Sequence, residues 1–241
     1  MAISRSDPGD DAVIVRMGLL TRRPDITPEQ FRRHWLTVHG PLAARLPGLR
    51  AYHQNHVVDS RQLGITHARG AWDLDGFSQL WFDDEDAMRR AVASDAYGPV
   101  AEDAGAFIGH TRVIVARQQA VVPVPADAGP LIKRMSLLTR RPEHDAERFR
   151  HEWLSVHAPV VARFPHLVGY TQNLIVGREA TPGAVAPYDA VPADGIVEMW
   201  FGDVDGLRAA FASDAAREAQ THAREFIAEI TTFLVEPHEV V

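Results

Sequence analysis

Two histidines, His39 and His157, are the clearest candidates for chemistry in this sequence. They stand in the segments W-L-T-V-H-G-P and W-L-S-V-H-A-P, each at the expected end of an apolar helix. An unperturbed imidazole has a pKa of about 6.5, so a modestly buried histidine exchanges protons near neutral pH as a general acid or base. The alternative is a cap on the last helical carbonyl groups, which the helix dipole favours.

A short polar motif on the next expected strand is the second candidate. It reads Tyr52-His53-Gln54-Asn55 in one place and Tyr170-Thr171-Gln172-Asn173 in another. On a strand, Tyr52 and Gln54 share one face and Asn55 points to the other, unless a bulge intervenes. Polar groups on a partly apolar strand need partners, which favours a pocket lining. The alternative is a tyrosine hydroxyl bonded in the core, with the asparagine starting a turn.

Gln79 and Glu198 occupy matching places, next to Leu-Trp81 and Met-Trp200 respectively. Burial would raise the pKa of the Glu198 carboxyl, which would then be a candidate acid or base present once only. The alternative is an ion pair with an arginine on a neighbouring strand, such as Arg134. We take eight strand residues as candidate substrate contacts: Gln54, Asn55, Gln79, Trp81, Gln172, Asn173, Glu198 and Trp200.

These residues recur because the chain repeats itself. Residues 17–55 align without a gap with residues 135–173, and 22 of the 39 positions are identical. The match resumes at an offset of 119 and continues to the end of the repeat. Three prolines and a glycine between Val121 and Pro130 indicate an extended connector. We therefore predict a first module over 13–118, a connector over 119–130 and a second module over 131–237.

Hydrophobic patterning predicts the elements of one module. Thr27-Pro28 starts a helix in which Phe31, Trp35 and Val38 form the buried stripe. Gly40-Pro41 ends this helix, and Pro41 opens a short second helical turn that reaches Leu46. The strands that surround it are expected over residues 13–21, 49–58, 76–82 and 111–116, with further helix over 84–92 and on to 107. This β-α-β-β-α-β order is ferredoxin-like and leaves one apolar sheet face without a partner. We expect an α+β fold in which two such modules form an intrachain pseudo-dimeric α/β barrel.

Composition narrows the chemistry. The chain has 241 residues, no Cys, 12 His and a net charge of −7. Disulfides, thiol catalysis and Cys-ligated metals are therefore excluded. The acidic balance argues against nucleic acid, and the sequence has neither a signal peptide nor a membrane span, so we expect a cytoplasmic protein. We expect no metal, because His34 and His39, five apart, should point away from each other on a helix, and His53 and His56 should lie on opposite strand faces.

The motifs L-L-T-R-R-P, E-x-F-R-x-x-W-x-x-V-H-G-P and Y-x-Q-N, followed by L-W-F-D, resemble the EthD domain of the dimeric α/β-barrel superfamily. The resemblance covers both modules. It implies a fold shared with cofactor-free dehydratases, decarboxylases, isomerases and monooxygenases in which a pocket histidine transfers a proton. His39 and His157 would then be catalytic, with Tyr52 and Tyr170 as their bonding partners. The second module departs from the first at Ala158, which replaces a glycine.

We therefore expect a cofactor-independent enzyme, a lyase or isomerase, that dehydrates, isomerises or decarboxylates a small hydrophobic organic substrate, aromatic or polyketide-like. One alternative is a noncatalytic binding or accessory protein of a degradation pathway. Another is a haem or oxygen-handling barrel, although no residue stands out as an axial ligand. A homodimer of two-module chains is compatible with all three hypotheses.

Overall fold

Each module begins with an apolar strand and a well-capped helix. In the computed structural model, which describes residues 14–241, the Thr27 hydroxyl accepts from the Gln30 backbone N–H, and the Gln30 side chain accepts from the Thr27 N–H. This capping box fixes the start of the first helix where the sequence predicts it. Val13, the predicted first residue of the first module, lies outside the described residues.

The two modules repeat one order of elements. Module 1 contains β1 (Ile14–Arg22), α1 (Pro28–His34), a π-helical segment (Trp35–His39), α2 (Gly40–Ala43), β2 (Ala51–Asp59), β3 (Gly76–Phe82), α3 (Glu85–Val92), α4 (Tyr97–Phe107) and β4 (Ile108–Val122). Module 2 contains β5 (Ile132–Arg140), α5 (Ala146–His151), a π-helical segment (Glu152–His157), α6 (Ala158–Val161), β6 (Leu167–Thr181), β7 (Ala184–Val185), a 3-10 turn (Tyr188–Ala190), β8 (Gly195–Phe201), α7 (Val204–Ala212), α8 (Asp214–Phe226) and β9 (Ile227–Glu239).

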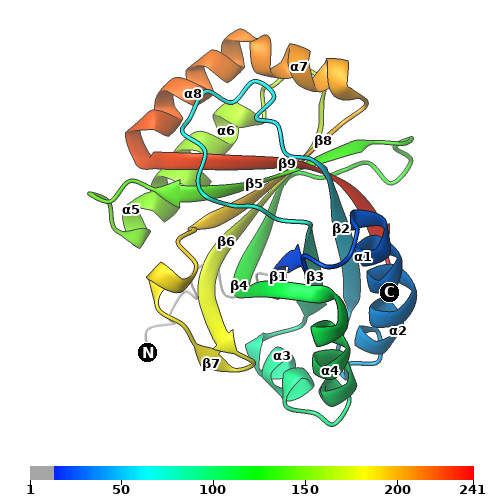
Figure 1. Ribbon diagram of the computed structural model, residues 1–241. Coiled ribbons are helices and arrows are strands. Elements are labelled where there is room, and N and C mark those ends of the chain that lie inside the picture. Colours follow the sequence, from blue (N-terminus) through cyan, green and yellow to red (C-terminus); the bar gives the residue numbers. More distant parts are fainter. Residues whose placement is uncertain (1–13) are drawn as a thin grey trace, which may run out of the picture.

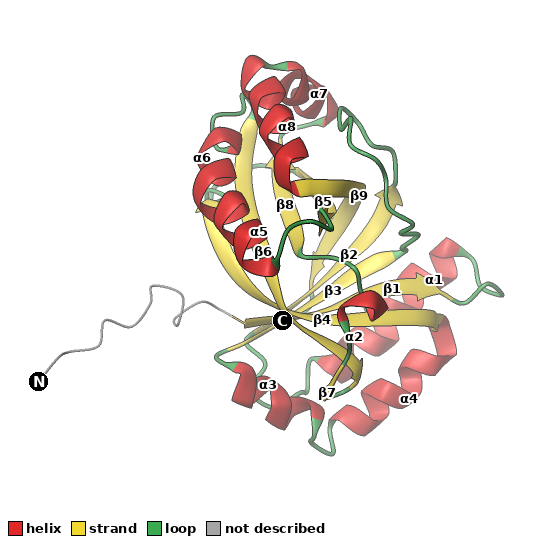
Figure 2. Cartoon of the chain, turned by 90° about the vertical axis from the view of Figure 1, so that its left-hand side faces the viewer, coloured by secondary structure: helices red, strands yellow, loops and turns green. Residues whose placement is uncertain are grey.

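Eight antiparallel strands form one closed barrel (Figure 1), which confirms the predicted fold class. Their order is β4-β1-β3-β2-β9-β5-β8-β6, and β6 pairs with β4 to close the ring. Two pairings, β2 with β9 and β4 with β6, join the modules by backbone hydrogen bonds. The helices of the two modules cover the outside of the barrel on opposite sides (Figure 2). The barrel therefore has an interior face and two separate spaces between sheet and helices.

Both inter-module pairings lengthen strands beyond their predicted ends. β4 continues to Val122, into the predicted connector, because its last residues pair with β6, for example Gln119 with Gln172. β9 likewise continues to Glu239, where it pairs with His53 of β2. A single-module sequence pattern does not contain these partners, so it underestimates both strands.

The helix that follows β1 differs from the prediction. The helical turn predicted from Pro41 is present as α2, but no break precedes it: the Gly40 N–H donates to the Trp35 carbonyl, five residues back, and the helix continues into α2. A π-helical turn has one more residue than an α-helical turn, so the side chains after it are rotated about the helix axis. Val38, predicted to be in the core, is therefore 42% exposed, while His39 is 8% exposed. Val156 and His157 show the same exchange in module 2.

The loop in which the two repeats differ has two distinct forms. In module 2 it becomes the long end of β6, β7 and the 3-10 turn. In module 1, residues 60–75 form a segment, here called the strap, that runs across to module 2 near α8 (cyan in Figure 1). Gln62 donates to the Ile230 carbonyl, and Ala68 forms a bridge with Glu229. Each variable loop thus contacts the other module.

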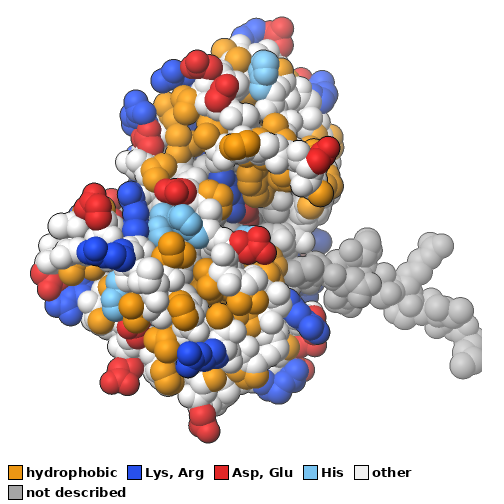
Figure 3. Space-filling model, turned by 90° about the vertical axis from the view of Figure 1, so that its right-hand side faces the viewer, with side chains coloured by type: hydrophobic (Ala, Val, Ile, Leu, Met, Phe, Trp, Pro, Cys, Tyr) orange, Lys and Arg blue, Asp and Glu red, His pale blue; other side chains and the backbone are white. Residues whose placement is uncertain are grey.

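Charged and apolar side chains are interspersed on the face shown in Figure 3, and histidines are visible between the two halves of the molecule. No helix within residues 14–241 is both long and apolar enough to cross a membrane.

Candidate functional site

Each module has a pocket between its helices and the outer face of the barrel. The pocket of module 1 has a volume of about 100 Å³ and includes His39 and Tyr52 in its lining. The pocket of module 2 has a volume of about 50 Å³ and includes His157 and Tyr170. The structure thus places each candidate catalytic histidine in the same pocket as its candidate tyrosine.

In module 1, the π-helical turn aims His39 at a carboxylate. The Nδ1 atom of His39 lies 2.9 Å from one oxygen of Asp103 on α4, and the Nε2 atom of His34 lies 2.9 Å from the other. The prediction that His34 and His39 point apart is wrong, because five residues is the hydrogen-bonding repeat of a π-helix. Both histidines therefore share one carboxylate.

Burial, more than this contact, sets the protonation of His39. Burial lowers the pKa of His39, while the hydrogen bond and the negative charge of Asp103 act in the opposite direction. The ring is then neutral at neutral pH, and its Nδ1–H donates to Asp103, which leaves a lone pair on Nε2. A neutral imidazole oriented by a carboxylate is the arrangement that a general base requires.

Tyr52 supplies a hydrogen-bond donor in the same pocket. Its hydroxyl accepts from the Trp35 ring N–H at 2.9 Å and from the Gln54 amide at 3.2 Å. Burial raises the pKa of Tyr52, so the phenol stays protonated. Because both of these partners donate, the proton of the Tyr52 hydroxyl is available for an acceptor such as a substrate carbonyl.

Module 2 keeps the histidine but changes its partner. Asp103 is replaced by His222, and His34 by Glu152, so the acidic and basic positions are exchanged. The Nδ1 atoms of His157 and His222 lie 3.2 Å apart, and His222 Nε2 lies 3.3 Å from Glu152. Burial, together with the nearby His222 and His67, lowers the pKa of His157 to about 3. His157 is therefore a much weaker base than His39.

The glutamine motif also differs in one contact. Gln172 donates to the Tyr170 hydroxyl at 2.8 Å and to the Trp153 carbonyl at 3.0 Å, as its counterpart does in module 1. The oxygen of Gln54 contacts the His56 ring at 3.0 Å. The equivalent residue in module 2 is leucine, and the buried Gln172 oxygen has no partner in the described structure.

The remaining candidates lie inside the barrel, on the other face of the sheet from the pockets. These are Asn55, Gln79, Trp81, Asn173, Glu198 and Trp200, which were predicted as substrate contacts. Strand alternation separates them from Tyr52 and Gln54. The structure therefore does not bring the predicted site together: it divides it between two pockets and the barrel interior.

The interior residues form a buried ion pair and its hydrogen-bond network. Lys133 Nζ lies 2.6 Å from Glu198, and Gln79 and Asn173 each donate to the same carboxylate at 2.7 Å. Lys133 also donates to Asn55 at 2.9 Å. The prediction that Glu198 pairs with Arg134 is wrong, because Lys133 is the residue of β5 that faces the barrel interior. Arg134, the next residue, faces the helices and packs on Phe211.

Several pocket residues were missed by the sequence reasoning. Asp103, Arg16 and Ser78 belong to the module 1 site, and His222 to that of module 2. The signal was present in the repeat, because Asp103 aligns with His222 and His34 with Glu152, which is a reciprocal exchange of acid and base. Arg16 has a repeat as well, in Arg134.

Neither a metal nor a haem fits these pockets. Among residues 14–241, no group of three or more His, Asp or Glu side chains is placed to hold a metal ion. Pockets for drug-sized ligands and cofactors typically occupy roughly 300 Å³ or more, so cavities of about 100 and 50 Å³ have no room for a haem. The two pockets instead suit compact organic molecules.

Comparison with solved structures places this architecture among known folds. An anthrone oxidase-like protein aligns with 96% of this chain and 95% of its own, at 12% identity and a TM-score of 0.65. A candidate monooxygenase from Lactobacillus acidophilus NCFM aligns over 94% of each chain, at 12% identity and a TM-score of 0.57. A second, from Fusobacterium nucleatum, covers 95% of this chain and 93% of its own, at 8% identity and a TM-score of 0.59. At these identities the likeness shows a shared fold.

Among curated proteins, none matches this sequence. The EthD domain, by contrast, matches twice, over residues 23–111 and 141–229, and each match falls within one module of the barrel. The chain therefore belongs to the EthD family, in which it is a tandem of two domains that complete one dimeric α/β barrel within a single chain.

Proposed function

We propose that module 1 is a cofactor-independent enzyme site that transfers a proton on a small, mostly apolar substrate carrying a carbonyl group. The observation that carries this proposal is the contact of His39 Nδ1 with Asp103, in a pocket that also contains the Tyr52 hydroxyl. A base with a free Nε2 lone pair and a donor for a developing oxyanion are the two groups that enolisation needs.

The chemistry follows from these groups. His39 Nε2 removes a proton from the carbon next to the carbonyl, and the electron pair moves onto the carbonyl oxygen, where Tyr52 donates a hydrogen bond. Asp103 stabilises the imidazolium that forms. In an isomerisation, the imidazolium returns the proton to another carbon. In a dehydration, the electron pair expels the hydroxyl group one carbon further on, and that group takes the proton of the imidazolium and leaves as water. In a decarboxylation, the electron pair released with carbon dioxide moves onto the carbonyl oxygen beside Tyr52, and the carbon then gains a proton that water supplies through His39.

The pocket limits the substrate. Leu20, Leu80 and Val100 give it apolar walls, and Ser78 adds a hydroxyl. Among the described lining residues the one arginine or lysine is Arg16, and Glu179 of module 2 binds it at 2.8 Å, so its charge is already neutralised. An apolar cavity of about 150 Å³ accepts benzene. At about 100 Å³, this pocket is smaller than that, so it suits a compact neutral molecule or the carbonyl end of a larger one whose ring stays at the pocket mouth.

The experiment measures the first step without knowledge of the product. Small aromatic ketones are incubated with the protein in D₂O, and deuterium at the carbon next to the carbonyl is followed by NMR. We expect the native protein to accelerate exchange and His39→Gln to lower the rate by about 10²–10⁴, the usual contribution of a general base. His157→Gln is the matched control and should retain most of the rate. Equal exchange by the native protein and His39→Gln would refute the assignment.

A second candidate function is oxidation of the same deprotonated carbon by dioxygen. The names of the similar structures, an anthrone oxidase-like protein and two candidate monooxygenases, favour it. Oxygen consumption that accompanies loss of the substrate would distinguish oxidation from isomerisation or loss of water, because only oxidation consumes oxygen.

A further inference from the structure

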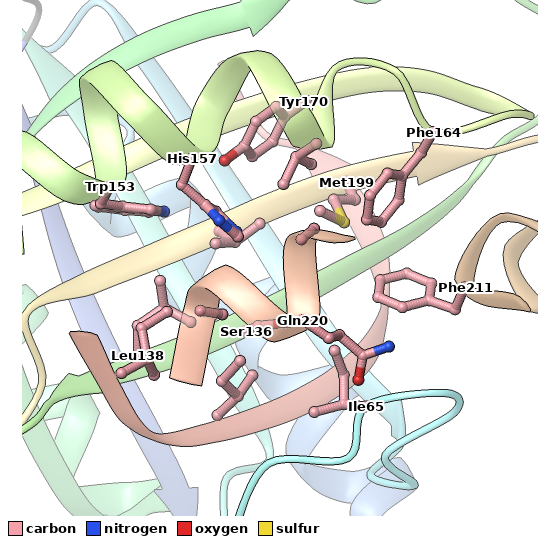
Figure 4. A pocket seen from close by; sticks show the side chains of 16 residues that line it. Ile65, Ser136, Leu138, Trp153, His157, Phe164, Tyr170, Met199, Phe211 and Gln220 are labelled. Carbon is pink, nitrogen blue, oxygen red and sulfur yellow. The ribbon is translucent and has the colours of Figure 1, made fainter. Parts of the chain in front are cut away.

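We propose that the pocket of module 2 is a separate binding site for an uncharged, apolar molecule, and that the strap of module 1 closes it through Ile65. This site is distinct from the proton-transfer site of module 1, and Figure 4 shows it with His157 on one side and Ile65 on the other.

The walls of the pocket select against polar and charged ligands. Apolar side chains form most of the lining, among them Leu138, Val161, Phe164, Val197, Met199 and Phe211. Arg134 is the residue of module 2 that corresponds to Arg16 of module 1. Its guanidinium packs on the Phe211 ring and donates to carbonyl groups of the strap. No arginine, lysine, aspartate or glutamate lines this pocket within the described residues.

The polar groups of the pocket are largely committed to the protein. His157 contacts His222, and the Tyr170 hydroxyl accepts from Gln172, so the proton of this hydroxyl is an uncharged donor that a ligand can still use. Gln220 accepts twice from Thr66 of the strap. A ligand that carries a charge would lose its hydration without gaining an opposite charge, whereas an apolar ligand loses nothing. The chemistry of the site therefore fits a hydrocarbon or aromatic ring.

The strap belongs to the site. Arg134 binds the carbonyl groups of Gln62 and Leu63, and Ile65 then lies against the pocket. Among the described residues, none of module 2 lines the pocket of module 1. There the long β6–β7 arm instead pairs Glu179 with Arg16. Ligand entry to module 2 therefore depends on a segment of the other module.

The volume indicates the size of the occupant. About 50 Å³ is left with Ile65 in place, and apolar cavities of this kind remain dry and accept xenon or benzene when they are large enough. A ring of benzene size needs the space that Ile65 occupies. We therefore expect Ile65 to set the upper size of the ligand.

The test uses the full chain with xenon and fluorobenzene as probes, followed by ¹²⁹Xe and ¹⁹F NMR. Ala223 lines the module 2 pocket, and Ala104 is its exact counterpart in module 1. Ala223→Leu fills the pocket of module 2, and Ala104→Leu fills the pocket of module 1. Thermal unfolding checks that both variants fold. We expect the native module 2 pocket to bind xenon, Ala223→Leu to weaken this binding at least tenfold, and Ala104→Leu to keep it. Ile65→Ala should tighten fluorobenzene binding at least tenfold.

The native protein and Ile65→Ala together keep the proposal open to refutation. If neither binds either probe, or if binding is lost in Ala104→Leu and retained in Ala223→Leu, the module 2 site is wrong. Deuterium exchange by module 1 is measured in the same samples. Because Ala223→Leu leaves His39 and Tyr52 untouched, failure of the apolar site and failure of the proton-transfer site give different results.

Discussion

The two modules keep the same side chains in the same places but arrange charge differently around them. In module 1 the pocket histidine contacts a carboxylate, Asp103, directly. In module 2 the pocket histidine contacts His222, and it is His222 that contacts the carboxylate of Glu152. The barrel interior shows the opposite asymmetry. There module 2 has the charged pair Lys133 and Glu198, where module 1 has Val15 and Gln79. The fold therefore preserves geometry through duplication, while electrostatics is set locally.

The interior comparison gives the largest expected effect. Lys133→Val alone leaves Glu198 buried without its cation, which should lower the free energy of unfolding by about 3–5 kcal/mol. The double variant Lys133→Val/Glu198→Gln copies the neutral pair of module 1 and should recover most of this loss. Urea unfolding measures both. A single variant as stable as the native protein would show that the charge contrast between the modules carries no energy.

The pH dependence of stability is the next largest effect. The folded pKa of His157, about 3, lies below the unfolded value of about 6.5, so the unfolded chain binds the proton first. Stability contributed by the neutral ring is complete above pH 6.5 and is lost as the pH falls towards 3. We expect the native protein to lose roughly 2 kcal/mol more than His157→Gln between pH 7 and 5.

Urea unfolding at both pH values measures this difference, and His39→Gln is the matched control. Its difference from the native protein should be smaller, because Asp103 opposes the effect of burial on the pKa of His39. If the free energy of unfolding changes equally with pH in the two variants, the two pockets do not differ electrostatically.

The smallest effect comes from copying one pocket into the other. Glu152→His/His222→Asp gives module 2 the acid and base positions of module 1. In the His39→Gln background, this exchange should raise the pKa of His157 and increase deuterium exchange by about tenfold. NMR titration of the histidine ring measures the pKa directly. A folded variant in which the pKa of His157 does not rise would show that the carboxylate position does not control the base.

The sequence was sufficient for the architecture because the repeat is long and its spacing constant. Residues 17–55 and 135–173 specify the same strand, helix and strand, and a ferredoxin-like sheet has an apolar face that a second copy covers. The closure of the barrel, however, depends on pairings between modules, such as Gln119 with Gln172. These contacts join residues whose patterns carry no information about each other, so the strand ends were underestimated.

The site was predicted in part, and the π-helical turns explain the rest. A period of 3.6 residues places Val38 in the core, and only the insertion of one residue in the turn brings His39 inward. Asp103 and His222 lie on helices whose sequences are typical of polar, solvent-facing surfaces. Their contacts with the pocket histidines could therefore not be predicted from the sequence. The candidate residues are divided between the pockets and the barrel interior because side chains alternate along a strand. The same alternation predicts from the sequence that Asn55 and Gln54 lie on opposite faces.

The link between β4 and β5 has a consequence for how the two sites can change. In a barrel assembled from two identical single-domain chains, any substitution enters both pockets at once, and dilution separates the halves. In this chain the halves stay at a high effective concentration whatever the protein concentration, since their association is intramolecular. Each codon also acts on one pocket only. A substitution that abolishes proton transfer in one half can therefore be tolerated, or put to another use, while the other half continues to work.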